Sequence, residues 1–252
     1  MTIEHLCAEV LDHGRIALID AMPAEPGGGD ARIVQAARVS LAHLPSSVHD
    51  IIGNTRHADE VRDPGADAKL IHYMLKHRHN TPFEKVRFEF FIEAPIFVAR
   101  QWFRYRTGSF NEQSARYSEL ADKFYIPSIE RMQEQSKDNR QGSGERIEDD
   151  LARDMQTDMA QHCQAAYELY KGLLKDGLTR ELARAVLPVN IYTSWYWTVD
   201  LRNLFNFFTE RLDDHAQYEI RAYAEAILPM VKYIAPIALS AYFLEIVAKE
   251  KY

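Results

Sequence analysis

The sequence predicts an α+β fold, with a mixed, largely antiparallel sheet in the first half and a predominantly helical second half. Two patterns predict this class. Apolar and charged residues alternate from Lys85 to Glu93, which is typical of a half-buried strand. After residue 148, apolar residues recur at helical spacing instead. A length of 252 residues, with 46% hydrophobic and 27% charged residues, fits a single domain spanning 1–252.

In the first half, the elements follow from apolar runs and from residues that begin or end helices. The apolar run Arg15–Met22 predicts a buried strand. Asp30 is a candidate N-cap of a helix that runs to about Leu41, and a second helix should span 67–76. Proline suits the first turn of a helix, so we expect a third helix from Pro95 to Gly108.

The second half should be helical after a polar segment. Residues 133–149 are polar and charged, which predicts a surface loop. A helix is expected over 148–174, and Thr179 should cap a short helix that Pro188 ends.

Two further helices are expected near the C-terminal end. The first carries an apolar face at i, i+3, i+4 and i+7, formed by Leu201, Leu204, Phe205 and Phe208. Asp213 or Asp214 should cap a last long helix, which we expect Pro229 to kink.

The composition indicates which partners and which cellular compartment to expect. No window approaches the roughly 18 consecutive apolar residues of a membrane helix, so we expect no membrane association. Two cysteines suit a reducing compartment, which predicts a cytoplasmic protein. A formal net charge of -7 argues against a protein that coats nucleic acid.

The strip from Gln101 to Arg116 is the strongest candidate for a binding site. Arginines crowd a predicted helix end and the segment after it, and guanidinium groups bind phosphates and carboxylates bidentately. Gln101 and Arg104 are three apart and share a helix face, whereas Arg106 lies about 200° around from Arg104 on a regular helix. Arg106 should therefore meet a different ligand or ligand part. From composition alone, a solvated basic patch is an equally good interpretation.

Other polar clusters are weaker candidates. His77 and His79 could ligate a metal, but no third histidine follows at a convincing spacing, so we expect no metal site. Arg202 and Asn206 are four apart and lie opposite an apolar stripe, where simple solvent exposure is the better explanation from spacing. The segment 27–29 has neither dinucleotide-binding nor P-loop spacing.

Several blocks of this sequence resemble the flavin-dependent thymidylate synthases. The signature of that family is Arg-His-Arg, seven residues, then Ser, and it appears here as Arg104-Tyr105-Arg106 with Ser114. Four more blocks occur in family order: HNTPFE (79–84), APIFVARQWFR (94–104), ARAVLPVNIYT (183–193) and RLDDHAQYEI (211–220). Four ordered blocks are far more specific than one short signature.

The resemblance implies reductive methylation of dUMP to dTMP. Methylenetetrahydrofolate would be the carbon donor, NADPH the reductant and bound FAD the hydride carrier. It also implies a homotetramer whose active sites are each assembled from several subunits. All these ligands carry phosphate or carboxylate groups, which suits the arginines of the strip.

The resemblance also implies site residues. Those expected to hold dUMP are Gln101, Arg104, Glu112, Gln113, Ser114, Ala115, Arg116, Arg184 and Arg211. Those expected to hold FAD are His79, Thr81, Arg104, Tyr105, Arg106, Glu112, Asp200, Arg202 and Asn206. Arg211 is the expected catalytic residue, because a fixed positive charge beside the pyrimidine would favour the ionised ring.

Two positions depart from the family pattern. Tyr105 stands where the signature has histidine, so the titratable imidazole is replaced by a phenol. Asp200 stands where asparagine is frequent, which adds a negative charge near an expected FAD contact. Three other interpretations stay open: a flavoprotein without synthase activity, a non-catalytic nucleotide- or RNA-binding protein, and a metal-dependent hydrolase.

Overall fold

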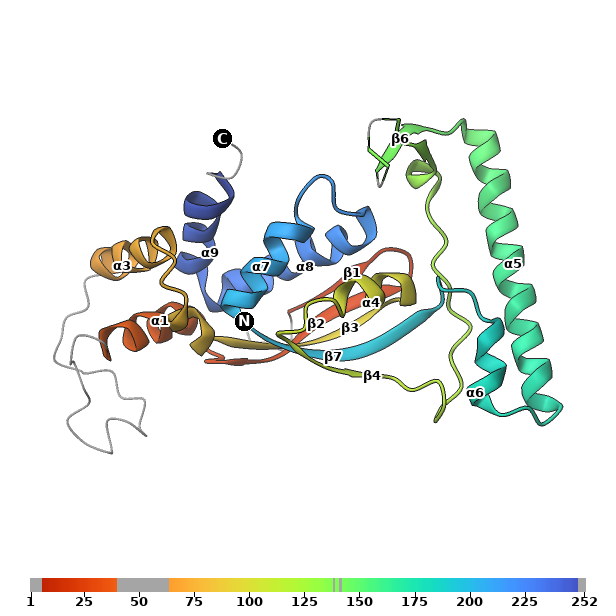
Figure 1. The fold of residues 1–252 in the computed structure, drawn as a ribbon, viewed down its shortest axis with the longest axis horizontal. Coiled ribbons are helices and arrows are strands. Elements are labelled where there is room, and N and C mark those ends of the chain that lie inside the picture. The colour runs from red at the N-terminus through yellow and green to blue at the C-terminus, as the bar shows by residue number, and fades with distance from the viewer. Residues whose placement is uncertain (1–5, 40–63, 138, 141, 249–252) are drawn as a thin grey trace.

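In the computed structural model, five strands of the described chain form one antiparallel sheet (Figure 1). The structure describes residues 6–39, 64–137, 139–140 and 142–248. The strand order is β1-β2-β3-β7-β4, and every neighbouring pair is antiparallel. The strands are β1 (Cys7–Val10), β2 (Gly14–Met22), β3 (Arg87–Pro95), β4 (Ser109–Glu112) and β7 (Tyr192–Asp200). The antiparallel sheet confirms the predicted α+β class.

The strand β7 was not predicted, and it lies within a second half that is predominantly helical, as expected. It lies between β3 and β4, so a segment from late in the chain holds two early strands together. Its inward side chains include Trp195 and Trp197, which alternate with more exposed residues in the period of two that a half-buried strand requires. In the register, Phe90 of β3 pairs with Trp197 of β7.

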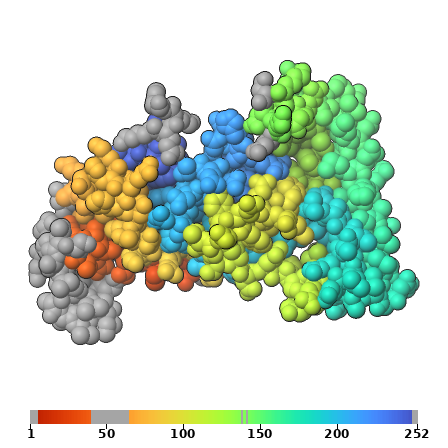
Figure 2. Space-filling model, in the orientation of Figure 1, coloured from red at the N-terminus to blue at the C-terminus, as the bar shows by residue number. Residues whose placement is uncertain are grey.

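Helices cover one face of the sheet, and further helices lie beyond both of its ends (Figure 1). Over the sheet lie α4 (Ile96–Trp102), α7 (Leu201–Arg211) and α8 (Tyr218–Ile234). One end carries α1 (Gly28–Val39), α3 (Pro64–Lys76), α9 (Pro236–Tyr242) and the π-helical turn Phe243–Val247. The other end carries α5 (Asp149–Lys175) and α6 (Arg180–Ala183), which form a continuous flank opposite α3 (Figure 2). Short 3-10 turns span Thr81–Lys85, Ile129–Arg131 and Arg184–Val186.

The main core lies between the sheet and these helices, and Trp102 is at its centre. Its indole is fully buried at the last residue of α4. Ring centroids of Trp195 and Trp197 from β7 lie 5.4 and 5.3 Å away, and that of Phe207 from α7 lies 4.9 Å away. These aromatic contacts join α4, β7 and α7 into one packed unit.

Several predicted boundaries need correction. The third helix ends at Trp102 rather than Gly108, because the chain turns tightly there: the Tyr105 amide donates to the Trp102 carbonyl at 3.0 Å. The last long helix begins at Tyr218, and Asp213 instead accepts a hydrogen bond from the His215 amide at 2.8 Å.

Two other expectations differ in detail. The segment expected as a surface loop over 133–149 contains a short hairpin of β5 (Gln133–Gln135) and β6 (Ser143–Arg146). Pro229 lies inside α8, which continues to Ile234. The predicted helices 67–76 and 148–174 match α3 and α5 closely, and β2 matches the predicted strand. No helix in the described part of the chain is long and apolar enough to cross a membrane.

Asp30 caps a different helix from the one predicted. It lies inside α1, and its buried carboxylate accepts hydrogen bonds from the amides of Ile237 and Ala238, at 2.8 and 2.9 Å. These amides belong to the first turn of α9, whose free N–H groups and positive dipole end favour a carboxylate. The early helix α1 is thereby tied to the last helices of the described chain.

Asp30 should make stability depend on pH. Burial raises the pKa of Asp30 from 3.8 to about 6, although the two amide hydrogen bonds lower it. The folded state therefore holds the proton more tightly than the unfolded state, and stability is lost as pH rises from about 4 to about 6. Between pH 5 and pH 7.5, the free energy of unfolding of the wild type should fall by roughly 1 kcal/mol relative to that of Asp30→Asn, whose amide at position 30 does not titrate.

Urea unfolding of both proteins at the two pH values measures this difference. Asp158→Asn, on the exposed surface of α5, keeps Asp30 and is the matched control, so its stability should change with pH as that of the wild type does. A difference between wild type and Asp30→Asn that stays constant with pH would contradict the assignment.

Candidate active site

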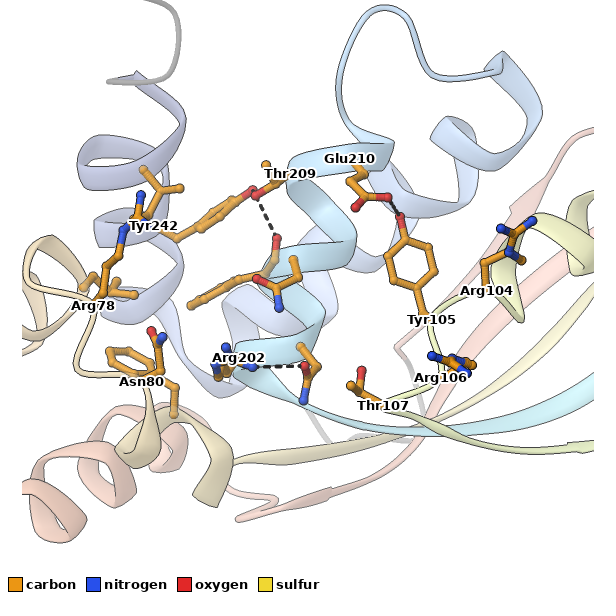
Figure 3. A pocket seen from close by; sticks show the side chains of 16 residues that line it. Arg78, Asn80, Arg104, Tyr105, Arg106, Thr107, Arg202, Thr209, Glu210 and Tyr242 are labelled. Atoms are coloured by element: carbon orange, nitrogen blue, oxygen red, sulfur yellow. Dashed lines mark hydrogen bonds between the residues drawn. The ribbon is translucent and has the colours of Figure 1, made fainter.

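The end of α4 directs the arginine strip into a cavity. After Trp102 the chain leaves the helix, and residues 104–107 pass along the cavity wall (Figure 3). Gly108 then lets the backbone pass close to the indole of Trp197, since a Cβ at this position would lie 2.3 Å from the indole nitrogen. The buried aromatic core thus sets where these arginines stand.

The cavity has a volume of about 820 Å³, within the range of small-molecule and cofactor sites. Its walls come from the end of α3, the following turn, the segment after α4, one face of α7, and the last helical turns. The residues lining it are Leu75, Arg78, Asn80, Phe83, Arg104, Tyr105, Arg106, Thr107, Arg202, Asn203, Phe205, Asn206, Thr209, Glu210, Tyr242 and Ile246.

Positive charge dominates this cavity. Its charged lining residues are four arginines (Arg78, Arg104, Arg106 and Arg202) and one carboxylate, that of Glu210. Arg202 is only loosely paired, with its Nε 3.9 Å from the Glu84 carboxylate. Guanidinium groups in a concave, partly enclosed site favour a phosphorylated or carboxylated ligand.

The structure changes two expectations about these arginines. Arg104 and Arg106 line the same cavity, because the helix on which their opposite faces were predicted has already ended. Arg202 and Asn206 line that cavity as well, from one face of α7, rather than simply facing solvent.

Tyr105 connects the strip to the end of α7. Its hydroxyl donates a hydrogen bond of 2.6 Å to the Glu210 carboxylate (Figure 3). The guanidinium carbon of Arg211 lies 5.3 Å from the centre of the Tyr105 ring, in a cation–π contact. Burial, together with the bond to Glu210, raises the pKa of Tyr105, so the phenol stays protonated. Arg211, the expected catalytic residue, is thus held beside the cavity.

Gln101 belongs to a buried hydrogen-bond network. Its amide nitrogen donates to the side-chain oxygen of Gln217, whose own amide nitrogen donates to Glu219 at 2.7 Å. Glu219 is almost fully buried and also accepts from Tyr125 at 3.1 Å and from Arg131 at 3.0 Å. Because a carboxylate only accepts, it fixes the orientation of the Gln217 amide and, through it, that of Gln101.

A second group of expected dUMP residues lies toward α6. Glu112 accepts a hydrogen bond from Thr193 at 2.9 Å, at the far end of β4. Arg116 pairs with Glu181 at 2.8 Å, and the backbone oxygen of Glu181 accepts from Arg184 at 3.3 Å. Arg116 and Arg184 therefore meet at the start of α6, outside the cavity lining.

Three further members of this group lie along the same stretch, between β4 and the α6 cluster. The Gln113 amide donates to the Ser194 carbonyl at 2.8 Å, and the Ser114 hydroxyl accepts from the Arg116 amide at 3.3 Å. Ala115 is buried in a small second hydrophobic cluster. One chain thus presents the expected dUMP residues in two separate places.

The remaining expected FAD residues flank the cavity without lining it. His79 and Thr81 are exposed on either side of the cavity residue Asn80. Asp200 caps α7 by accepting from the Asn203 amide at 2.9 Å, and Asn203 itself lines the cavity. Among the described residues, no group of three or more His, Cys, Asp or Glu could hold a metal ion.

The sequence matches one known protein family over most of its length. The family model described as thymidylate synthase complementing protein matches residues 17–237. A flavin-dependent thymidylate synthase of Dictyostelium discoideum is 45% identical over 237 residues, covering 93% of this chain and 73% of the relative. The chain belongs to the flavin-dependent thymidylate synthase family.

A second relative and a solved structure are also similar to this chain. A flavin-dependent thymidylate synthase of Thermus thermophilus is also 45% identical, over 94% of this chain and 78% of the relative. The crystal structure of the UMP/dUMP methylase PolB from Streptomyces cacaoi, bound with 5-Br dUMP, superposes with a TM-score of 0.77 at 31% identity. That match covers 94% of this chain and 97% of the methylase.

The family motifs did not identify every cavity residue. Arg78, Asn80, Thr209, Glu210 and Tyr242 line the cavity but were not among the expected ligand contacts. One signal was available, because Arg202 and Asn206 begin a helical face whose next member at i+8 is Glu210. Thr209 lies on the same face, three residues after Asn206, and Asn80 lies inside the block 79–84. Arg78 and Tyr242 come together only through packing between distant parts of the chain.

The buried Glu219 should be important for stability. Glu219→Ala leaves the Arg131 guanidinium without its carboxylate, and we expect a loss of about 3 kcal/mol in the free energy of unfolding. Denaturant unfolding measures the loss. The matched control is Asp149→Ala, which breaks a solvent-exposed ion pair with Arg146 and should change stability far less. Equal losses in the two variants would contradict the role assigned to the network.

Proposed function

We propose that this protein catalyses the reductive methylation of dUMP to dTMP, using methylenetetrahydrofolate, NADPH and bound FAD. The observation that carries the proposal is the arginine-lined cavity beside Tyr105 and Arg211, in a chain of this family. The cavity offers guanidinium groups for phosphates and, at its edge, a fixed cation for a pyrimidine.

The chemistry of the lining fits FAD. Four arginines suit a pyrophosphate, which carries two negative charges. Phe83, Phe205 and Tyr242 provide apolar and aromatic surface for flat rings, and Asn80 and Asn206 can both donate to and accept from ring edges. When bound, the flavin supplies hydride transfer, and the protein supplies binding and orientation.

Arg211 is the residue that we assign to activation of the pyrimidine. Its guanidinium is mostly buried, with a side-chain exposure of 21%, so its charge is less screened than that of a surface arginine. Beside a uracil carbonyl it would stabilise negative charge on the ring. Arg104, which lines the cavity next to Tyr105, would bind both nucleotide ligands.

The divided dUMP residues favour an active site shared between subunits. Arg116 and Arg184 meet near α6, whereas Gln101 and Arg211 belong to the elements around α7. A second copy of the chain could bring its α6 group to the cavity of the first, as in the homotetramer that we propose.

Exposed apolar side chains support this association. On α5, Leu151, Met155 and Met159 repeat at every fourth residue with exposures of 49%, 38% and 38%. Ile19 and Tyr196 are each 45% exposed on strands of the sheet. Apolar rows of this kind are typical of surfaces that bury against a partner. A cytoplasmic location is part of the same proposal, since Cys7 and Cys163 are free.

Product analysis tests the reaction. Protein supplied with FAD, NADPH and methylenetetrahydrofolate should oxidise NADPH only when dUMP is present, and should yield dTMP. UMP is run in parallel, because the Streptomyces methylase also has a structure bound with 5-Br UMP. Saturable FAD binding without any dTMP would refute the synthase proposal in favour of a flavoprotein of another activity.

Arg211→Ala tests the assignment to the pyrimidine. Turnover should be abolished while FAD binding, followed by flavin fluorescence, survives, because Arg211 is not among the cavity-lining residues. Loss of FAD binding would instead place Arg211 in the cofactor site. Arg202→Ala is the converse control, and should weaken FAD binding directly.

Mixing two inactive variants tests whether sites are shared. Arg211→Ala and Arg184→Ala protomers, unfolded and refolded together, should regain roughly a quarter of wild-type activity if each site takes these residues from different chains. Each variant refolded alone should stay inactive. If the mixture also stays inactive, both residues act from the same chain and the shared-site proposal fails.

A further inference from the structure

Arg211 ends α7 with little hydrogen bonding of its own. Its Nε is buried and has no hydrogen-bond partner among the residues that the structure describes. The carboxylate of the neighbouring Glu210 lies 3.7 Å from one terminal nitrogen. A free arginine side chain has many rotamers, and holding it in one costs about 2 kcal/mol of entropy. Something other than Nε must therefore fix the guanidinium.

Tyr105 makes the contacts that can do this. Its ring lies under the guanidinium, 5.3 Å from the carbon to the ring centre. Its hydroxyl donates the 2.6 Å hydrogen bond to Glu210, which places the carboxylate against the same guanidinium. The edge of the ring also packs on Phe207, with centroids 5.0 Å apart. Because Phe207 is fully buried in the core, its contact restricts the movement of the Tyr105 ring.

A phenol suits this position better than an imidazole. Arg104 and Arg106 flank Tyr105 in sequence, and Arg211 lies over its ring. A protonated histidine here would add a fourth positive charge and repel Arg211. The neutral phenol gives the guanidinium an electron-rich face and still donates to Glu210.

We propose that Tyr105 is a positioning residue for Arg211: its ring supports the guanidinium, and its hydroxyl holds Glu210 as the counter-charge. Tyr105 thereby acts on nucleotide binding through Arg211, in addition to facing the FAD cavity. This inference rests on the proposed function for its consequence in catalysis, but the position of Arg211 can be measured independently of that function.

Substitutions at Tyr105 separate the two contacts. Tyr105→Phe keeps the ring and removes the hydrogen bond to Glu210, whereas Tyr105→Leu removes the aromatic face as well. On FAD-loaded protein, titration with dUMP is followed through the flavin absorbance. We expect dUMP affinity to fall about 10-fold in Tyr105→Phe and further in Tyr105→Leu. FAD affinity, from flavin fluorescence, should change less than about 3-fold in Tyr105→Phe.

A double-mutant cycle distinguishes positioning from a general structural effect. Arg211→Lys keeps a positive charge but loses the planar group that stacks on Tyr105. If Tyr105 acts through Arg211, Tyr105→Phe should weaken dUMP binding much less in the Arg211→Lys background than in wild type. The proposal is overturned if the loss of dUMP affinity in the double variant equals the product of the losses in the two single variants. It is also overturned if Tyr105→Phe weakens FAD binding and leaves dUMP binding unchanged.

Crystal structures provide the readout that does not depend on activity. In Tyr105→Leu the Arg211 guanidinium should be displaced or occupy several conformers, while α7 stays in place. An unmoved guanidinium in that variant would overturn the proposal. If the wild type makes no dTMP but Tyr105→Leu shows this displacement, the proposed function is refuted and the positioning role of Tyr105 stands.

Discussion

The burial of Trp102 is the interaction on which the arginine-lined cavity depends. An indole of roughly 200 Å² that is removed from water contributes about 5 kcal/mol, a large fraction of the stability of a typical domain. Trp102 packs on β7 and α7 at once, so it fixes the end of α4 against both elements. Arg104 and Arg106 follow two and four residues later, so the packing of Trp102 determines where this segment of the chain begins.

A local site can be basic in an acidic protein. The chain has a formal net charge of -7, yet four arginines face one carboxylate in the cavity. Charges on the surface are screened over about 10 Å, whereas those in a concave site interact through a lower dielectric. An anionic ligand that enters therefore responds to the cavity lining more than to the whole protein. The net charge still disfavours unspecific binding to nucleic acid.

Much of the fold could be predicted because the periodic patterns of its strands and helices lie within short stretches of the sequence. The alternation in β3 and the helical periods of α3, α5 and α7 were visible in short windows. The strand β7 was missed although its side chains also alternate, because it joins α7 at Asp200 with no glycine or proline between them. Asp200 is both the last residue of the strand and the N-cap of the helix, so no separate turn divides the two elements.

The site was less predictable than the fold, for a different reason. The family motifs pointed to Arg104, Tyr105 and Arg106, which line the cavity together. Spacing alone assigned Arg104 and Arg106 to different ligands or ligand parts, because it assumed a helix to Gly108, whereas α4 ends at Trp102. Arg78 and Tyr242 are 164 residues apart in the sequence (242 − 78), and no local pattern connects them.

The bond between Asp30 and α9 has a consequence for the order of events during synthesis. The carboxylate and the amides that it caps are separated by 207 and 208 residues. The following turns supply Tyr242 and Ile246 to the cavity wall. A nascent chain can form the β1–β2 hairpin early, but Asp30 cannot bind the α9 amides until residues 237 and 238 have left the ribosome. The arginine-lined cavity is therefore complete only after α9 and the turn that follows it have been synthesised.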